Sequence, residues 1–300
     1  MTGAVGLDAA VRSATDRLRR AGITGPRTDA ELLAAHVLGA SPGQAWAAAV
    51  LGRPLTADQA RRLDDLVDQR AARVPLQHLT GRAGFRTLEL AVGPGVFVPR
   101  PETEVVAGLA VEACAGLDAP CVVDLCTGSA AIALSVAVEV PGARVVALER
   151  EPDALAWARL NVDRLAPGRV ELRAGDVAGC PAGVLADLVG AVDVVVANPP
   201  YIPRGMRPVD PEVADHDPAA ALYGGGDDGL VVPAAVVRAA AVLLHPGGLL
   251  VMEHGDAQGP ATRALATVAA GWTGTRTVPD LTGRDRALIA RRADPAAAPA

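Results

Sequence analysis

The tetrapeptide Asn198-Pro199-Pro200-Tyr201 combines residue types that can hold a planar amino group. Prolines have no backbone N–H and fix φ at about −65°, and the residue before a proline is kept out of the α region. The Asn198 side-chain oxygen and the Pro199 carbonyl can therefore accept both hydrogens of one –NH2 group, with the Tyr201 ring against the flat group that carries it. The pattern predicts a cradle for an amide or an exocyclic amine. A rigid strand-to-loop turn is the alternative.

An apolar run precedes this tetrapeptide and predicts where it lies. Residues 192–197 read VDVVVA, which indicates a buried strand that ends at Asn198. In open α/β sheets, ligands bind outside the carboxyl ends of the strands. The tetrapeptide is therefore expected at a position where chemistry is commonly done.

A second candidate site follows residues 121–125, CVVDL, which read as another short buried strand. The next five residues form a loop of small side chains before a helix predicted over 131–138: Cys126, Thr127, Gly128, Ser129 and Ala130. A strand, a small loop and a helix N-terminus together make a nucleotide cradle. Since only Gly128 is a glycine, the three-glycine pattern of pyrophosphate sites is absent. A ligand with a nucleoside and no phosphate fits better.

Two acidic residues follow the next predicted strands. Glu149 ends the strand 144–149 and follows Asp124 by 25 residues, a spacing at which a carboxylate can accept from both ribose hydroxyls. Asp176 follows the strand predicted over 170–173 and is placed to accept from an adenine amino group. A solvated loop acid is the alternative for Asp176.

Residues 1–75 read as helices only. An apolar stripe of helical period runs through residues 7–20. A capping box at 28–31 is expected to open a helix that stops at Gly39, and residues 56–59 are expected to open another. We interpret this part as a small helical bundle, either a stabilising cap or a docking surface for a macromolecular substrate.

Residues 76–101 are expected to form a hairpin linker, with a strand over 85–90 and a turn at 93–95. Phe97 and Arg100 lie just before a helix predicted over 102–114, so they are candidate site residues, with a surface turn as the alternative.

Beyond the tetrapeptide, the sequence predicts a long loop followed by further helices and strands. Residues 202–229, rich in Pro, Asp and Gly, predict a long loop that could cover the site. The expected elements after it are helices over 230–244 and 261–270, strands over 248–255, 275–278 and 286–290, and a disordered tail over 293–300.

The amino-acid composition excludes some classes of protein. The chain has 300 residues, half of them hydrophobic and 2% aromatic, so its core must be built from Ala, Val and Leu. The net charge of −6 argues against a broad nucleic-acid-binding face. No signal core, membrane span or paired metal spacing is evident, so a cytoplasmic protein with reduced cysteines and no metal site is expected.

The small loop with a ribose acid and a later Asn-Pro-Pro-Tyr resembles S-adenosyl-L-methionine-dependent methyltransferases of the amino-methylating kind. Four segments are similar, in the same order, to the peptide chain release factor glutamine methyltransferases, the PrmC/HemK family: QHLTG at 77–81, VPRPETE at 98–104, NPPY at 198–201 and EHG at 253–255. The resemblance covers about residues 7–292. Asn-Pro-Pro-Tyr alone is shared with adenine methyltransferases.

The resemblance implies an α/β fold: a Rossmann-like, seven-stranded class I methyltransferase domain over 102–292, joined to the helical domain 1–75 by the hairpin 76–101. It implies the cofactor S-adenosyl-L-methionine, held by Cys126 to Ala130, Glu149, Val177 and Asn198. It also implies a protein partner, a release factor whose Gly-Gly-Gln glutamine binds at Asn198 to Tyr201. No membrane and no direct nucleic-acid binding are expected.

Some positions depart from the family pattern. Cys126 and Ala130 stand where glycine is usual, Glu149 replaces the more common Asp, and Val177 stands where some members have an aromatic. If Ala130 needs a positive φ or contacts the cofactor, its methyl group costs about 1 kcal/mol or more.

Two other functions stay open from the sequence. One is a methyltransferase acting on adenine or another amino group in nucleic acid, which would want a basic groove. The other is a degenerate paralogue that docks release factors and has little activity.

Overall fold

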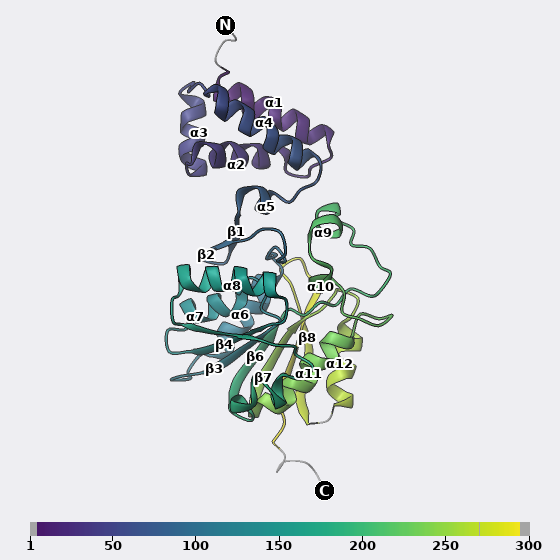
Figure 1. Cartoon of the computed structure of the whole chain (residues 1–300). Helices are drawn as coiled ribbons and strands as arrows, with labels where there is room; N and C mark the ends of the chain where they lie inside the picture. Colours follow the sequence, from purple (N-terminus) through teal and green to yellow (C-terminus); the bar gives the residue numbers. More distant parts are fainter. Residues whose placement is uncertain (1–4, 270, 295–300) are drawn as a thin grey trace. The chain divides into compact units, whose positions relative to one another are not determined.

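The computed structural model describes residues 5–269 and 271–294 (Figure 1). Two compact units divide these residues. One unit holds the chain up to Arg82 together with Val209–His216, and the other holds Ala83–Pro208 and the residues from Asp217 onward. Within the described residues, no helix is both long and apolar enough to cross a membrane.

The first unit is a bundle of short helices around an aliphatic core. Its helices are α1 (Leu7–Arg20), α2 (Pro26–Leu38), α3 (Pro42–Val50), α4 (Ala57–Ala71), α5 (Leu76–Thr80) and α9 (Pro211–His216). Leu18, Leu33 and Val67 are completely buried where α1, α2 and α4 meet. Glu212 connects α9 to α4, since its two carboxylate oxygens bind Arg70 and Arg73 at 2.8 Å each.

Helix ends in this bundle follow local chemistry, with one correction. The predicted capping box of Thr56 with Gln59 is present, and the predicted stop of α2 at Gly39 has a left-handed φ of 59°. The predicted capping box at 28–31 is wrong, because α2 already begins at Pro26, whose fixed φ suits a first helical turn. The sequence reading missed the capping box of Ser41 with Gln44 at the start of α3.

The second unit is built on a seven-stranded sheet, in the order β5-β4-β3-β6-β7-β9-β8. The strands are β3 (Cys121–Leu125), β4 (Arg144–Glu149), β5 (Val170–Ala174), β6 (Val192–Ala197), β7 (Leu244–Glu253), β8 (Trp272–Pro279) and β9 (Asp285–Arg292). Neighbours from β5 to β7 are parallel, while β9 is antiparallel to both β7 and β8. The predicted fold class, a seven-stranded α/β domain with an N-terminal helical region, is confirmed.

Helices cover both faces of this sheet. α6 (Thr103–Ala113), α7 (Ala131–Glu139) and α8 (Pro152–Leu165) pack on one face, and α11 (Val231–Leu243) with α12 (Gly259–Val268) on the other (Figure 1). Successive strand residues serve opposite faces, so Val122 joins the first layer and Val123 the second. Because both faces are covered, the strands are apolar runs without alternation.

The linker hairpin turns at a different place from the predicted one. The stretch 85–90, expected as one strand, contains the turn between β1 (Arg82–Phe85) and β2 (Leu88–Ala91). Arg86 has a φ of 51°, and its guanidinium binds both carboxylate oxygens of Glu139 at 2.7 and 2.6 Å. This long-range pair holds a turn that the alternating pattern of side chains does not reveal. The predicted turn at 93–95 is also present.

The region after β6 is more ordered than predicted. Residues 202–229, expected as one long loop, contain α9 and a further short helix, α10 (Ala219–Leu222). A bridge between Ile202 and Tyr223 closes part of this region on itself. The prediction of one uninterrupted loop is therefore wrong, because two short helices lie within it. Residues 270 and 295–300, which include the end of a predicted helix and most of the predicted tail, lie outside the described residues.

Candidate active site at the carboxyl edge of the sheet

Strand register brings the two candidate sites to one edge of the sheet. Leu125 pairs with Leu148 on one side and with Ala197 on the other, and Ala197 pairs with Met252. The residues that follow these positions are Cys126, Glu149, Asn198 and Glu253. They must therefore lie along the same edge, although they are far apart in the sequence.

The loop that follows β3 has an unusual backbone. Cys126, Gly128 and Ala130 have φ values of 62°, 57° and 65°, in the left-handed region. The Thr127 N–H donates to the Leu148 carbonyl at 3.0 Å, and the Ala130 N–H donates to the Thr127 carbonyl at 2.9 Å. A side chain added at Gly128 would meet nothing within 4 Å, so open space lies above this loop.

Ala130 meets one of the two conditions under which its methyl group was expected to cost free energy. Its φ is positive, and a left-handed conformation costs about 1 kcal/mol at a residue other than glycine. However, Ala130 is completely buried and belongs to the core under α7. Its methyl group therefore packs inward and does not fill the open space above the loop.

Two buried polar side chains, Asp124 and Asn161, form hydrogen bonds with this loop. Asp124 accepts from the Thr127 hydroxyl at 2.5 Å and from the Ala133 N–H at 3.1 Å, and burial raises the pKa of its carboxyl to about 7. Its other oxygen, Oδ1, has no hydrogen-bond partner among the described residues. On the far side, the Asn161 amide donates to the Ser129 carbonyl at 3.1 Å. The loop is thus fixed mostly through its main chain.

Glu149 is buried at the end of β4 and turned toward this loop. Its Oε2 accepts from the Gly128 N–H at 2.8 Å, and its Oε1 accepts from the N–H groups of Arg150 and Glu151 at 2.8 and 2.9 Å. A carboxylate has about four acceptor positions. One position on Oε2 therefore remains for a ligand hydroxyl, and a second hydroxyl would have to displace the Gly128 contact.

Asp176 and Val177 follow β5 at the same edge. Asp176 is exposed and accepts from the Ala178 N–H at 2.8 Å and from Arg150 at 3.2 Å. The hydrogen bond from Ala178 is the main reason that the pKa of Asp176 is lowered. Val177 is buried in the core on the α11 face. Their proposed contacts with an adenine ring stay predictions.

The Asn-Pro-Pro-Tyr corner has its own set of contacts. The Asn198 Nδ2 group donates to the Thr103 hydroxyl oxygen at 3.2 Å, and the Tyr201 hydroxyl donates to Glu253 Oε1 at 3.3 Å. The Tyr201 carbonyl accepts from Gln258 at 2.9 Å. Among the described residues, no hydrogen bond reaches the Pro199 carbonyl, which leaves it available as an acceptor.

Glu253 is the most deeply buried acid at this corner, with 3% of its surface exposed. Burial raises the pKa of its carboxyl to about 7, while the Thr103 hydroxyl and the positive charge of Arg286 act in the opposite direction. Burial also raises the pKa of the Tyr201 hydroxyl, and the neighbouring Glu253 raises it further. Tyr201 therefore keeps its proton and stays a donor.

Phe97 and Arg100 lie together, as candidate residues on one short segment. The Arg100 guanidinium carbon is 5.1 Å from the centre of the Phe97 ring, a cation–π distance. The same guanidinium binds the carboxylate of Asp217 at 2.6 Å, and that side chain is fully buried. Arg100 is thus engaged within the protein, and its contact with a substrate stays a prediction.

Sequence reasoning did not select three residues that the structure places at this edge: Asp124, Thr103 and Glu253. Asp124 was read only as part of a strand, although a charged residue inside an apolar run was a signal. Thr103 and Glu253 lie in the segments VPRPETE and EHG, but neither residue was singled out as a site candidate. Their contact with the corner arises because α6 and β7 pack against β6. A local sequence pattern does not predict such packing.

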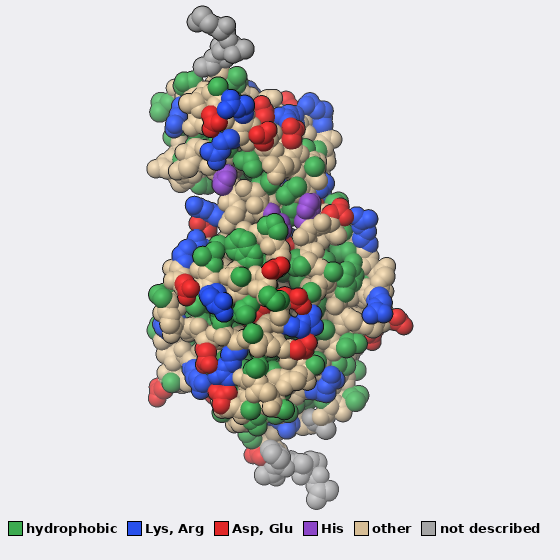
Figure 2. Space-filling model, viewed as in Figure 1, with side chains coloured by type: hydrophobic (Ala, Val, Ile, Leu, Met, Phe, Trp, Pro, Cys, Tyr) green, Lys and Arg blue, Asp and Glu red, His purple; other side chains and the backbone are tan. Residues whose placement is uncertain are grey.

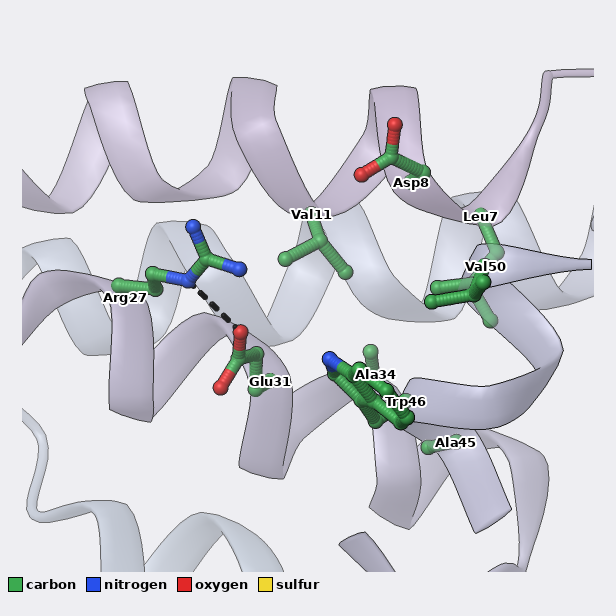
Figure 3. A pocket seen from close by; sticks show the side chains of 10 residues that line it. Leu7, Asp8, Val11, Arg27, Glu31, Ala34, Ala45, Trp46 and Val50 are labelled. Carbon is green, nitrogen blue, oxygen red and sulfur yellow. Dashed lines mark hydrogen bonds and ion pairs between the residues drawn. The ribbon is translucent and has the colours of Figure 1, made fainter. Parts of the chain in front are cut away.

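The first unit has a pocket of its own (Figure 3). Its volume is about 260 Å³, and apolar residues of α1, α2 and α3 line it, including Leu7, Val11, Trp46 and Val50. The ion pair of Arg27 with Glu31 lies at one side, at 2.8 Å. Trp46 is 61% exposed, which is unusual for a large aromatic side chain.

Charges are mixed on the surface. On the face seen in Figure 2, Arg side chains are interspersed with Asp and Glu side chains. This differs from the basic stripe that nucleic-acid-binding domains present. Among the described residues, no three His, Cys, Asp or Glu side chains are grouped so that they could hold a metal ion.

Known proteins resemble the chain in both of its parts. Residues 9–81 match the family described as PrmC N-terminal domain, and residues 118–278 match the family described as methyltransferase domain. Proteins named release factor glutamine methyltransferase are similar along nearly the whole chain. The one from Streptomyces coelicolor is 49% identical over 290 residues, 96% of this chain and 98% of that protein.

Two further proteins of the same name agree. The one from Bifidobacterium longum is 45% identical over 287 residues, 93% of this chain and 97% of that protein. The one from Mycolicibacterium smegmatis is 46% identical over 286 residues, 95% of this chain and 98% of that protein. The similarity covers the helical unit as well as the sheet, so both parts of the chain have a counterpart in these proteins.

Proposed function

We infer that this chain, which belongs to the release factor glutamine methyltransferase family, transfers a methyl group from S-adenosyl-L-methionine to a glutamine side-chain amide. The glutamine is the one in the Gly-Gly-Gln loop of a peptide chain release factor. One observation carries this proposal. Strand pairing sets the Asn198-Pro199 corner at the same sheet edge as the loop 126–130 and Glu149.

The residues at this edge fit S-adenosyl-L-methionine. Three positions of loop 126–130 have a positive φ, and a Cβ added at Gly128 would meet no atom within 4 Å, so a ligand has room to approach the backbone there. Glu149 keeps one acceptor position for a ribose hydroxyl, and the buried Asp124 retains an unpartnered oxygen below the loop. When bound, S-adenosyl-L-methionine supplies a methyl group on a positively charged sulfur, which is already an activated leaving group.

The chain's own contribution is to make an amide nitrogen reactive and to aim it. An amide nitrogen is a poor nucleophile, because its lone pair is delocalised into the carbonyl. Acceptors on both of its N–H groups, Asn198 Oδ1 and the Pro199 carbonyl, raise the electron density on nitrogen and fix its direction. No base has to act before the transfer, since the nitrogen can lose its proton afterwards.

The helical unit is proposed to dock the release factor. The pocket beside Trp46 offers an apolar floor with a charged rim, which suits a side chain presented by a protein surface (Figure 3). Since release factors work at the ribosome, the proposal includes a cytoplasmic location. Trp46→Ala is expected to raise KM for the release factor several-fold with kcat unchanged.

Mass spectrometry tests the proposed reaction directly. A purified release factor is incubated with the enzyme and S-adenosyl-L-methionine, and its Gly-Gly-Gln peptide is analysed. A mass increase of one methylene, located on the glutamine side chain, supports the proposal. A peptide that stays unmodified while nucleic acid becomes methylated would refute it.

A further inference from the structure

The two prolines of the corner 198–201 limit how its main chain can be anchored. A proline has no backbone N–H, so the middle of the corner can be held only through its carbonyl groups. Directly after the prolines, the Tyr201 carbonyl accepts a hydrogen bond from the side chain of Gln258 at 2.9 Å. This end of the corner is therefore held by a donor that lies 57 residues away in the chain.

Gln258, which directly precedes α12, binds three main-chain groups with its side-chain amide. Nε2 donates to the carbonyls of Tyr201 and Asp228 at 2.9 and 3.0 Å, and Oε1 accepts from the Gly255 N–H at 2.9 Å. Because two partners are carbonyls and the third is an N–H, they fix which side of the amide carries the oxygen. One side chain thus joins the corner to the residues after β7 and to the segment after α10.

The segment after α10, residues 223–229, packs its backbone directly against the corner. It reads YGGGDDG, and we call it the glycine segment. A Cβ atom at Gly224 would lie 2.6 Å from the Pro200 carbonyl oxygen, and one at Gly229 would lie 2.2 Å from the Tyr201 carbonyl oxygen. Both distances are too short for a real Cβ atom. Only glycine therefore allows the two stretches of backbone to approach so closely.

Main-chain hydrogen bonds hold the glycine segment beside the chain that leaves the corner. The Ile202 N–H donates to the Leu222 carbonyl at 2.8 Å, and the Gly224 N–H donates to the Ile202 carbonyl at 3.1 Å. The Gly224 carbonyl in turn accepts from the Val232 N–H in α11 at 2.9 Å. The glycine segment is therefore tied both to the corner and to a helix that packs on the sheet.

We propose that Gln258 is a positioning residue: with the glycine segment, it holds the main chain of the corner so that Asn198 Oδ1 and the Pro199 carbonyl both reach the substrate amide. This inference rests on the proposed function of the corner. Two acceptors must meet the two hydrogens of one nitrogen at the same time, so a shift of the main chain by about 1 Å can cost roughly 10²-fold in rate. Prolines fix φ, but they do not fix where the corner lies.

Two substitutions separate the donors of Gln258 from its acceptor. Gln258→Met removes all three hydrogen bonds, whereas Gln258→Glu keeps an acceptor for the Gly255 N–H and removes both donors. Each is expected to lower kcat for release factor methylation roughly tenfold, while the Kd for S-adenosyl-L-methionine changes less than about twofold. The cofactor should be little affected because the three hydrogen bonds of Gln258 all lie outside the loop 126–130.

Gln59 provides the matched control. It is also half-buried near the start of a helix, and its Oε1 accepts from the Thr56 N–H, three positions earlier, at 3.1 Å. Gln59→Met and Gln59→Glu should leave kcat unchanged. Calorimetry gives the stoichiometry of S-adenosyl-L-methionine binding for each variant. A merely structural role of Gln258 would lower this stoichiometry and kcat in proportion, whereas a positioning role lowers kcat at full stoichiometry.

A glycine variant disturbs the same carbonyl without changing Gln258. Gly229→Ala forces a methyl group against the Tyr201 carbonyl, and it is expected to lower kcat at least as much as Gln258→Met. Gly168→Ala is the control, since Gly168 has the same φ of 74° and a Cβ atom there would meet nothing within 4 Å. If Gly229→Ala does not fold, the Gln258 variants still decide the question.

Two results would overturn the inference. One is a Gln258→Met enzyme with full cofactor stoichiometry and wild-type kcat. The other is a Gln258→Glu enzyme with wild-type kcat, since the bond to Gly255 alone would then suffice. Asn198→Ala is measured beside them. If Asn198→Ala is fully active, the proposed function of the corner fails; if it is inactive while both Gln258 variants are fully active, only the role of Gln258 fails.

Discussion

Two strand ends form the candidate site, and they are held in different ways. After β3, the loop 126–130 is fixed mainly through its backbone, by left-handed φ values and by hydrogen bonds to main-chain groups. After β6, the corner 198–201 is stiffened by two prolines and then oriented by side chains of α6 and β7. The first end presents backbone to its ligand, and the second presents a side-chain oxygen and a carbonyl.

Substitutions are expected to have different effects at the two strand ends. A loop held by its backbone tolerates different side chains, provided that each can adopt the required φ. Cys126 and Ala130 both adopt such a φ in this loop, at 62° and 65°. The corner is proposed to act through Oδ1 of Asn198. It has no such tolerance, because this oxygen must be present and must point toward the substrate.

The largest expected effect is on kcat, when Asn198 in the corner after β6 is replaced. Asn198→Ala removes the oriented acceptor and should lower kcat for release factor methylation by roughly 10²–10³-fold, as for loss of one preorganised transition-state contact. Binding of S-adenosyl-L-methionine, measured by calorimetry, should change much less. Full activity in this variant would contradict the assigned role.

The next effect tests Glu149, which lies at the end of β4 and accepts a hydrogen bond from Gly128 in the loop after β3. Glu149→Ala removes the ribose acceptor and should weaken S-adenosyl-L-methionine binding by about 1.5–3 kcal/mol, or roughly 10- to 100-fold in Kd. At saturating cofactor, kcat should stay near the wild-type value. Glu151→Ala, at the neighbouring half-buried acid, is the control and should leave Kd unchanged. A large fall in kcat with unchanged Kd would contradict the assignment.

The pH dependence of the unfolding free energy tests two buried acids, Asp124 in β3 and Glu253 at the end of β7. The carboxyl groups of Glu253 and Asp124 have a pKa of about 7, above the ordinary values of 4.5 and 3.8. The native state therefore binds more protons than the unfolded state between about pH 5 and 7. The free energy of unfolding should fall as the pH rises through this range and become level above it.

Glu253→Gln isolates one of the two contributions. Relative to wild type, this variant should gain about 1–3 kcal/mol of unfolding free energy between pH 5 and 7.5, because it has no charge to bury. Urea denaturation at both pH values measures the difference. Parallel curves for variant and wild type would contradict the raised pKa.

The smallest expected effect concerns Ala130. Replacing it by glycine relieves about 1 kcal/mol of left-handed strain but removes a buried methyl group, worth about 0.8 kcal/mol, and adds unfolded-state entropy. These terms nearly cancel, so Ala130→Gly should change the unfolding free energy by less than about 1 kcal/mol. The Kd for S-adenosyl-L-methionine should be unchanged, since the methyl group points into the core. A Kd that improves tenfold would show that the methyl group reaches the ligand.

Much of the second unit was predictable because its strands are buried on both faces. Such strands appear as short apolar runs, and the strands 121–125, 144–149 and 192–197 were predicted with the bounds that the structure has. The hairpin turn at Arg86 was not, because a distant carboxylate on α7 holds it. The helices within 202–229 were missed for a similar reason, since α9 is held by ion pairs of Glu212 with the distant Arg70 and Arg73.

By itself, the sequence determined the order of strands and helices, the stiffness of the Asn-Pro-Pro-Tyr corner and the small-residue loop, because these follow from local hydrophobicity and from the backbone limits of proline and glycine. Which groups meet at the sheet edge depends instead on how the strands and helices pack. The contact of Thr103 with Asn198 spans 95 residues, and that of Tyr201 with Glu253 spans 52. Contacts of this kind arise when parallel strands pair and helices pack on them, and no local pattern records them.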